Sequence, residues 1–130
     1  MKNGVQGLVL PVPPSANRWW RRSGTHMYKS TEARDYQTYV NRLARSLGIR
    51  MIRRPAVVAF QVTWHRDKRM GDLDKRLGIV LDALQGVVYE NDSQIVEIHA
   101  KRVDSKENPR IEVTVYEIKE AQGGGIQSVA

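Results

Sequence analysis

Two aspartates separated by a single leucine, Asp72 and Asp74, are the residues of this sequence best suited to chemistry. In an extended segment both carboxylates can face away from the core, and at about 4 Å they would repel by roughly 4 kcal/mol. A cation between them removes that repulsion, and Mg²⁺ prefers one or two carboxylates together with water and phosphate oxygens. The alternative is helix capping, which explains one aspartate at a helix start better than two.

A third aspartate, Asp92, lies 18 residues beyond Asp74 in a polar turn. A helix of about 12 residues between them spans roughly 18 Å, and the segment 87–91 can return part of that distance. We therefore expect Asp92 to come back toward the first two aspartates, although an ordinary turn aspartate is the alternative. Glu90 and Asn91 are weaker candidates for the same role. Asp82 either is solvated or supports the site.

Basic residues surround the aspartates on both sides in the sequence: Arg66, Lys68, Arg69, Lys75 and Arg76. Hydrolysis of a phosphodiester needs both kinds of group, because a metal activates water while cations hold the flanking phosphates. The sequence therefore favours a metal-dependent nuclease site. The alternative is a solvated charged loop.

Two tryptophans alternate with cations in the segment Arg18, Trp19, Trp20, Arg21 and Arg22. One of them could stack on an unpaired base, a contact worth about 1–3 kcal/mol, while the arginines bind DNA. The alternative is that one or both cover a sheet edge or form a dimer contact. The histidines at 26, 65 and 99 are too widely spaced to predict a metal site.

The charge of the 130-residue chain is unevenly distributed. Its net charge is +7, but residues 1–71 carry 14 Lys/Arg against 3 Asp/Glu, whereas residues 72–130 carry 7 against 11. A basic first half indicates an acidic partner, nucleic acid before membrane. The absence of cysteine excludes a disulfide scaffold, a thiol nucleophile and a cysteine-based zinc site. No signal peptide or membrane-spanning segment is apparent, so we expect a cytoplasmic protein.

The elements that must position these residues follow from hydrophobic periodicity. Strands are predicted at 5–10, 56–65, 95–103 and 111–118, with the last two as a hairpin, and helices at 31–47 and 73–84, ended by Gly48 and Gly86. Residues 15–29 read as a loop. The order β-α-β-α-β-β predicts an α+β fold with a mixed sheet and two helices packed on it. We expect one domain over 1–119 and a disordered tail over 120–130.

Four segments of the chain together resemble the RusA family of Holliday junction resolvases: residues 11–18 (PVPPSANR), 72–74 (DLD), 81–84 (LDAL) and 91–95 (NDSQI). The resemblance runs from about Leu10 to Glu117. It implies a homodimer that binds four-way DNA junctions and cuts two strands with Mg²⁺. It also implies that Asp72, Asp74 and Asp92 are the metal-binding carboxylates.

The chain departs from the family at two positions. The family has an important lysine four residues after the second aspartate, where this chain has Gly78, and an asparagine just after that aspartate, where it has Lys75. Residues 75 and 78 are i,i+3 neighbours on a helix. Our hypothesis is that Lys75 supplies the missing cation, with Arg76 as the alternative.

The sequence thus predicts a Mg²⁺-dependent, structure-selective endodeoxyribonuclease. Asp72, Asp74, Asp92 and Lys75 would act in catalysis, and the DNA-binding residues would be Arg18, Arg21, Arg22, Arg66, Lys68, Arg69 and Arg76. The expected partners are branched DNA and a second copy of the chain, with no membrane and no small-molecule cofactor. A basic DNA- or RNA-binding module without catalysis is the alternative. An anionic-membrane binder is weaker, because the basic residues do not lie opposite one apolar helix face.

Overall fold

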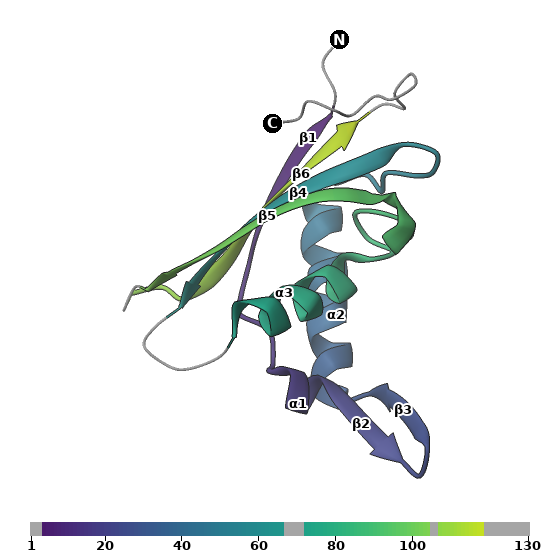
Figure 1. Ribbon diagram of the computed structural model, residues 1–130, viewed down its shortest axis with the longest axis vertical. Helices are drawn as coiled ribbons and strands as arrows, with labels where there is room; N and C mark the ends of the chain where they lie inside the picture. The colour runs from purple at the N-terminus through teal and green to yellow at the C-terminus, as the bar shows by residue number, and fades with distance from the viewer. Residues whose placement is uncertain (1–3, 67–71, 105–106, 119–130) are drawn as a thin grey trace.

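A four-stranded mixed sheet forms one layer of the protein (Figure 1). The computed structural model describes residues 4–66, 72–104 and 107–118. Its strands are β1 (Val5–Leu10), β4 (Val57–Arg66), β5 (Ile95–Asp104) and β6 (Arg110–Ile118), in the order β1-β6-β4-β5. β6 pairs antiparallel with both β1 and β4, and β4 pairs parallel with β5. The predicted mixed α+β architecture is confirmed.

Alternating apolar residues direct one face of the sheet into the core. The inward residues of β4 are all buried: Val58, Phe60, Val62 and Trp64. Ile111, Val113 and Val115 of β6 are buried beside them, as are Leu8 and Leu10 of β1. The strand β5 differs, because Val96 and Ile98 remain exposed, as expected for an edge strand.

The two long helices cover the inward face of this sheet (Figure 1). α2 (Thr31–Ser46) begins after Ser30, whose hydroxyl accepts the backbone N–H of Ala33. α3 (Leu73–Leu84) links the parallel strands β4 and β5. The Gln37 side-chain amide of α2 donates a hydrogen bond to the Ala83 carbonyl of α3, which ties the helices together. Within the described residues, no helix is both long and apolar enough to cross a membrane.

The segment 15–29, predicted as a loop, instead contains three short elements. They are α1 (Ala16–Trp19) and the antiparallel strands β2 (Trp20–Ser23) and β3 (His26–Lys29). This hairpin projects away from the rest of the protein (Figure 1). Every residue of β2 is exposed, so the strand lacks the alternation of buried and polar residues by which strands are predicted. Gly24, with φ of +65°, makes the turn.

The predicted hairpin of the last two strands is wrong. β5 and β6 do not pair with each other, because β4 lies between them. β6 is apolar enough on its inward side to occupy a central place, whereas β5 carries Glu97, His99, Lys101 and Arg102 and suits the edge. The predicted tail at 120–130 lies outside the described residues.

Candidate functional site

A cavity of about 490 Å³ runs along α3, where this helix faces the start of β2 and the turn before β5. Its polar lining includes Asp74 and Lys75 from α3 and Asp92 from the short 3-10 helix η1 (Asp92–Gln94). Its apolar lining consists of Ala16, Trp20, Gly78, Ile79, Leu81 and Ile95. The structure therefore brings Asp74, Asp92 and Lys75 to one cavity, although Asp92 is 18 residues from Asp74.

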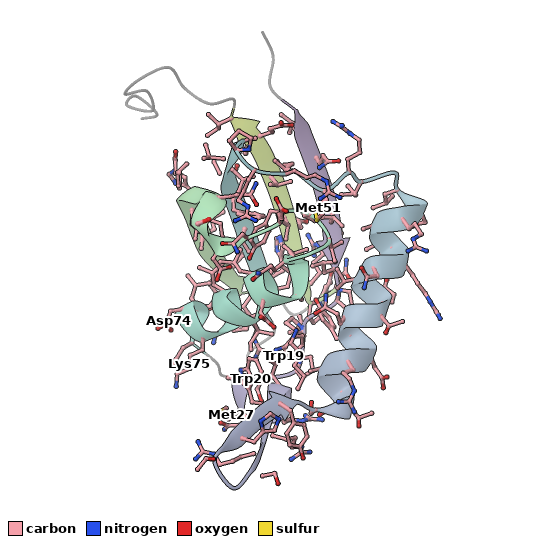
Figure 2. The ribbon with its side chains drawn as sticks, turned by 90° about the vertical axis from the view of Figure 1, so that its right-hand side faces the viewer. Trp19, Trp20, Met27, Met51, Asp74 and Lys75 are labelled. Atoms are coloured by element: carbon pink, nitrogen blue, oxygen red, sulfur yellow. The ribbon has the colours of Figure 1, made fainter. Side chains whose placement is uncertain are left out.

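Asp72 lies beside this cavity rather than in it. It lines an adjoining cavity that shares Ala16 and Lys75 with the first. The ammonium of Lys75 is 3.8 Å from Asp72 Oδ2, and both side chains are about two-thirds exposed, at 70% and 67%. Lys75 thus lies at the border between the two carboxylate positions, and Figure 2 shows it close to Asp74 at the start of α3.

The start of α3 holds the two aspartates in different ways. Asp72 is the N-cap residue with an extended backbone, but its side chain makes no capping hydrogen bond. Asp74, in the first turn, accepts the backbone N–H of Lys75 at 2.9 Å. Helix capping therefore does not account for the Asp72 carboxylate.

Tyr89 positions Asp92. Its hydroxyl donates toward the Leu81 carbonyl at 2.9 Å and the Asp92 carboxylate at 3.2 Å, so it links α3 to η1. The ring is fully buried and packs edge-on against Phe60, with centroids 5.5 Å apart. Burial and the negative charge of Asp92 raise the pKa of Tyr89 well above its ordinary value. The sequence reading missed this residue, because Val87–Tyr89 resembles an ordinary apolar segment.

Gln94 fixes the turn that carries Asp92. Its buried side chain accepts the backbone N–H groups of Glu90 and Asn91 and donates to the carbonyls of Ile52 and Ala56. Asn91 caps η1 by accepting the N–H of Ser93. Glu90 instead binds Arg54, whose backbone N–H lowers the pKa of the Glu90 carboxyl. Asn91 and Glu90 therefore hold the turn, and neither lines the cavity that contains Asp92.

The oxygen donors fit a hard divalent cation. Within residues 4–66, 72–104 and 107–118, no three His, Asp or Glu side chains gather closely enough to enclose a metal by themselves. Mg²⁺ does not require such a cage, since one or two carboxylates suffice when waters and substrate phosphates complete the coordination. Asp74 and Asp92, exposed in one cavity, match that requirement, and Asp72 lies next to it.

Arg76 has protein partners that Lys75 lacks. Its guanidinium donates to the Pro13 carbonyl at 2.7 Å and lies over the ring of Trp64, 4.9 Å from the centroid. Burial lowers its pKa. These contacts attach the start of α3 to the segment after β1 and to the core. They give Arg76 a structural role besides its predicted DNA contact.

The other cations predicted to bind DNA have different surroundings. Arg21 and Arg22 are exposed on the projecting hairpin. Arg18 forms a bidentate pair with Glu32, and Arg66 pairs with Asp104. Lys68 and Arg69 lie outside the described residues.

The two neighbouring tryptophans have opposite environments. Trp19 is fully buried, packs edge-on against Tyr36, and donates its indole N–H to Asp82 at 3.1 Å. Asp82 also pairs with Lys29 at 3.1 Å, so it supports the site by joining α3 to the base of the hairpin. Trp20 is 37% exposed and lines the cavity of Asp74 and Asp92.

Gly78 leaves space on the same wall of the cavity. A Cβ atom at this position would meet nothing within 4 Å, and Gly78 lines the cavity that Lys75 also lines. The space at position 78 that Lys75 would need in order to replace the missing lysine is therefore open, while the Lys75 ammonium lies beside Asp72.

Comparison with known proteins gives a consistent result. The family model of the endodeoxyribonuclease RusA matches residues 11–116. A crossover junction endodeoxyribonuclease of Enterobacteria phage HK97 is 30% identical over 113 residues, covering 86% of this chain and 94% of the relative. The crossover junction endodeoxyribonuclease of Escherichia coli K12 is 27% identical over 117 residues, covering 85% and 93%.

Proposed function

This chain belongs to the RusA family of endodeoxyribonucleases, and from that premise we propose that it resolves four-way DNA junctions at a Mg²⁺ centre held by Asp72, Asp74 and Asp92. The relatives named above are crossover junction endodeoxyribonucleases, which hydrolyse phosphodiesters in branched DNA. One observation carries the proposal for the site. Carboxylates from two separate elements, α3 and η1, line one cavity together with an exposed lysine.

The residues of the site have different roles in hydrolysis. Bound Mg²⁺ would activate water and neutralise charge on the phosphate. Asp74 and Asp92, which line one cavity, would hold the ion, and Asp72, which lines the adjoining cavity, would complete the set of carboxylates. Lys75 stabilises the negative charge that grows on the phosphate, because its ammonium is exposed beside these carboxylates. Tyr89 keeps Asp92 in place through its hydroxyl.

The basic residues of the first half bind the backbone of the junction arms. Phosphate contacts of this kind give affinity without reading base sequence, which suits an enzyme that recognises shape. Arg21 and Arg22 are exposed on the hairpin near the cavity, and Arg18 precedes them in α1. Arg66 lies at the end of β4, with its side chain 16% exposed and paired with Asp104. Lys68 and Arg69 belong to the same proposal from sequence alone.

A homodimer is part of the proposal. A two-fold axis matches a junction that is cut at two symmetry-related positions. Sedimentation of the free protein should give twice the 14.8 kDa chain mass. A cytoplasmic location follows from a DNA substrate.

The test is cleavage of a labelled four-way junction in Mg²⁺ by the native protein, Asp74→Asn and Asp35→Asn. Asp35 is an exposed aspartate of α2 outside both cavities, so it controls for loss of one negative charge. We expect paired cuts by the native protein and Asp35→Asn. Asp74→Asn should bind the junction without cutting it.

Two results would contradict the proposal. Cleavage that persists in Asp74→Asn would remove the carboxylates from the mechanism. Binding without cleavage by every variant, in Mg²⁺ or Mn²⁺, would favour the alternative of a basic DNA- or RNA-binding module.

A further inference from the structure

The apolar side of the cavity has no task in phosphate hydrolysis. Trp20, Ile79, Leu81 and Ile95 line it together with the carboxylates, and a Cβ atom at Gly78 would meet nothing within 4 Å. A metal and a phosphate need only polar groups. An exposed apolar pocket with an aromatic wall is suited to a flat, partly apolar group such as a nucleobase.

Trp20 is held beside this pocket by α1 and the β2–β3 hairpin. Its backbone N–H donates to the carbonyl of Ala16, the first residue of α1, and it pairs with Lys29 in the hairpin. Asp82 binds both Lys29 and the indole of Trp19. The base of the hairpin is therefore attached to the same helix that carries Asp74, which fixes the backbone of Trp20 relative to that helix.

The charges near Trp20 favour DNA over another protein as the occupant. Arg21 and Arg22 follow it directly on the exposed strand, and Lys75 shares its cavity. An indole ring among cations can stack on a base while the cations bind the adjoining phosphates.

We propose that Trp20 stacks on a nucleobase next to the phosphate being cut, and that this contact sets where the strand is cleaved. The proposal rests on the proposed nuclease function and adds a residue to it. Trp20 holds the nucleotide so that its phosphate lies at Asp74 and Asp92.

The first test compares Trp20→Leu, Trp20→Phe and Tyr116→Leu. Leucine keeps an apolar side chain but cannot stack, whereas phenylalanine can. Tyr116 is 36% exposed, against 37% for Trp20, and lies on the outward side of the sheet, so it controls for loss of an exposed aromatic. We expect Trp20→Leu to weaken junction binding roughly 5- to 100-fold and to scatter the cut positions, while the other two resemble the native protein.

The second test measures contact without cleavage. Trp19 and Trp64 are buried, at 0% and 2% exposure, so Trp20 is the tryptophan that acrylamide can reach. We expect a junction bound to the Asp74→Asn protein to protect this emission from acrylamide. The same protein carrying Trp20→Phe should show little accessible emission and little change.

The third test fills the pocket. Gly78→Met places a long apolar side chain in open space without a backbone clash, so the protein should fold as before. We expect it to compete with the base and to scatter the cuts as Trp20→Leu does.

The outcomes separate this inference from the nuclease proposal. If Trp20→Leu binds and cuts as the native protein does, or acrylamide still quenches Trp20 in the complex, the inference fails while Asp74-dependent cleavage stands. If Trp20→Leu instead changes the sedimentation of the free protein and not DNA binding, Trp20 belongs to a contact between chains and the inference is overturned.

Discussion

Lys75 and Arg76 are adjacent cations whose surroundings predict different effects of mutation. Lys75 is exposed beside Asp72, whereas Arg76 is bonded to Pro13 and stacked on Trp64. We expect Lys75→Ala to slow cleavage by about a hundredfold without a change in melting temperature. Arg76→Ala should lower the free energy of unfolding by roughly 1–3 kcal/mol, because it loses a charged hydrogen bond.

Single-turnover cleavage and thermal melting, measured on both variants, decide between these roles. The assignment of Lys75 is wrong if Lys75→Ala cuts at the native rate while Arg76→Ala is stable and inactive.

Tyr89→Phe tests the tether of Asp92. Phenylalanine keeps the packing against Phe60 but loses the hydrogen bonds to Leu81 and Asp92. We expect the variant to need more Mg²⁺ for half-maximal cleavage and to lose about 0.5–1.5 kcal/mol of stability at pH 7. The native pKa of Tyr89 is raised, so its stabilisation is present below pH 10.0, the ordinary tyrosine value, and is lost as the pH rises above it.

Urea unfolding at neutral pH and above pH 10.0 measures this difference. The stability of Tyr89→Phe should fall less steeply in the alkaline range than that of the native protein. Tyr36, whose pKa burial also raises, is present in both proteins and cancels in the comparison. Equal alkaline slopes would contradict the role of Tyr89.

For single residues, the sequence predicts the acidic residues of the site but not the side chains that hold them in position. Paired carboxylates and a distant turn aspartate are visible as residue types, and the structure places Asp74 and Asp92 at one cavity. The hydroxyl of Tyr89 and the amide of Gln94 act through partners that are close only after folding. No spacing rule relates Gln94 to Ile52, which is 42 residues away.

The helix α3 contains a glycine that its own geometry does not require. Gly78 has open space around a would-be Cβ, and its φ is ordinary for a helix. We expect Gly78→Ala to raise the free energy of unfolding by up to about 1 kcal/mol, because alanine is the better helix former. Gly86→Ala is the matched control, since Gly86 has a φ of +86° and the substitution there should destabilise.

Chemical denaturation of the two alanine variants measures both effects. A loss of stability in Gly78→Ala would mean that the position is strained in a way the open space does not reveal. A separate test adds Gly78→Lys to the Lys75→Ala protein. If a cation at either position can serve the same function, the double variant should regain cleavage.

The order of helices and long strands was predictable, but their pairing was not. Periodicity places strands at Val5–Leu10 and near 57–66, 95–104 and 110–118 because it reports burial on one face. A short link between two strands favours a hairpin by proximity alone. The sheet instead buries the more apolar β6 in the middle and leaves β5 at the edge. The β2–β3 hairpin escaped prediction because its side chains are exposed on both faces.

At the scale of the whole molecule, the excess of positive charge in the first half predicts salt-dependent DNA binding. The logarithm of the affinity should fall linearly with the logarithm of the salt concentration, by about 0.9 per phosphate contacted. Arg21→Ala and Arg22→Ala should each reduce that slope by about one contact. Asp74→Asn protein, titrated with junction over a range of salt, gives the measurement without cleavage.

A suitable control is Arg45→Ala, which removes an exposed arginine in the last turn of α2, distant in sequence from the hairpin. The salt dependence of its junction affinity should equal that of the Asp74→Asn protein without a further substitution. If all three variants share one slope, the hairpin does not bind phosphate.

The position of β6 has a consequence for how the protein is made. The last strand of the described residues lies inside the sheet, with β1 on one side and β4 on the other. Val5 pairs with Tyr116, so closing the sheet joins segments about 100 residues apart, a topology that folds slowly. While the chain is still emerging from the ribosome, β1 lacks its pairing partner β6. Phe60 and Val62 of β4 then lack the neighbouring strand that covers them in the finished sheet. Assembly of the nuclease therefore waits until synthesis has passed β6.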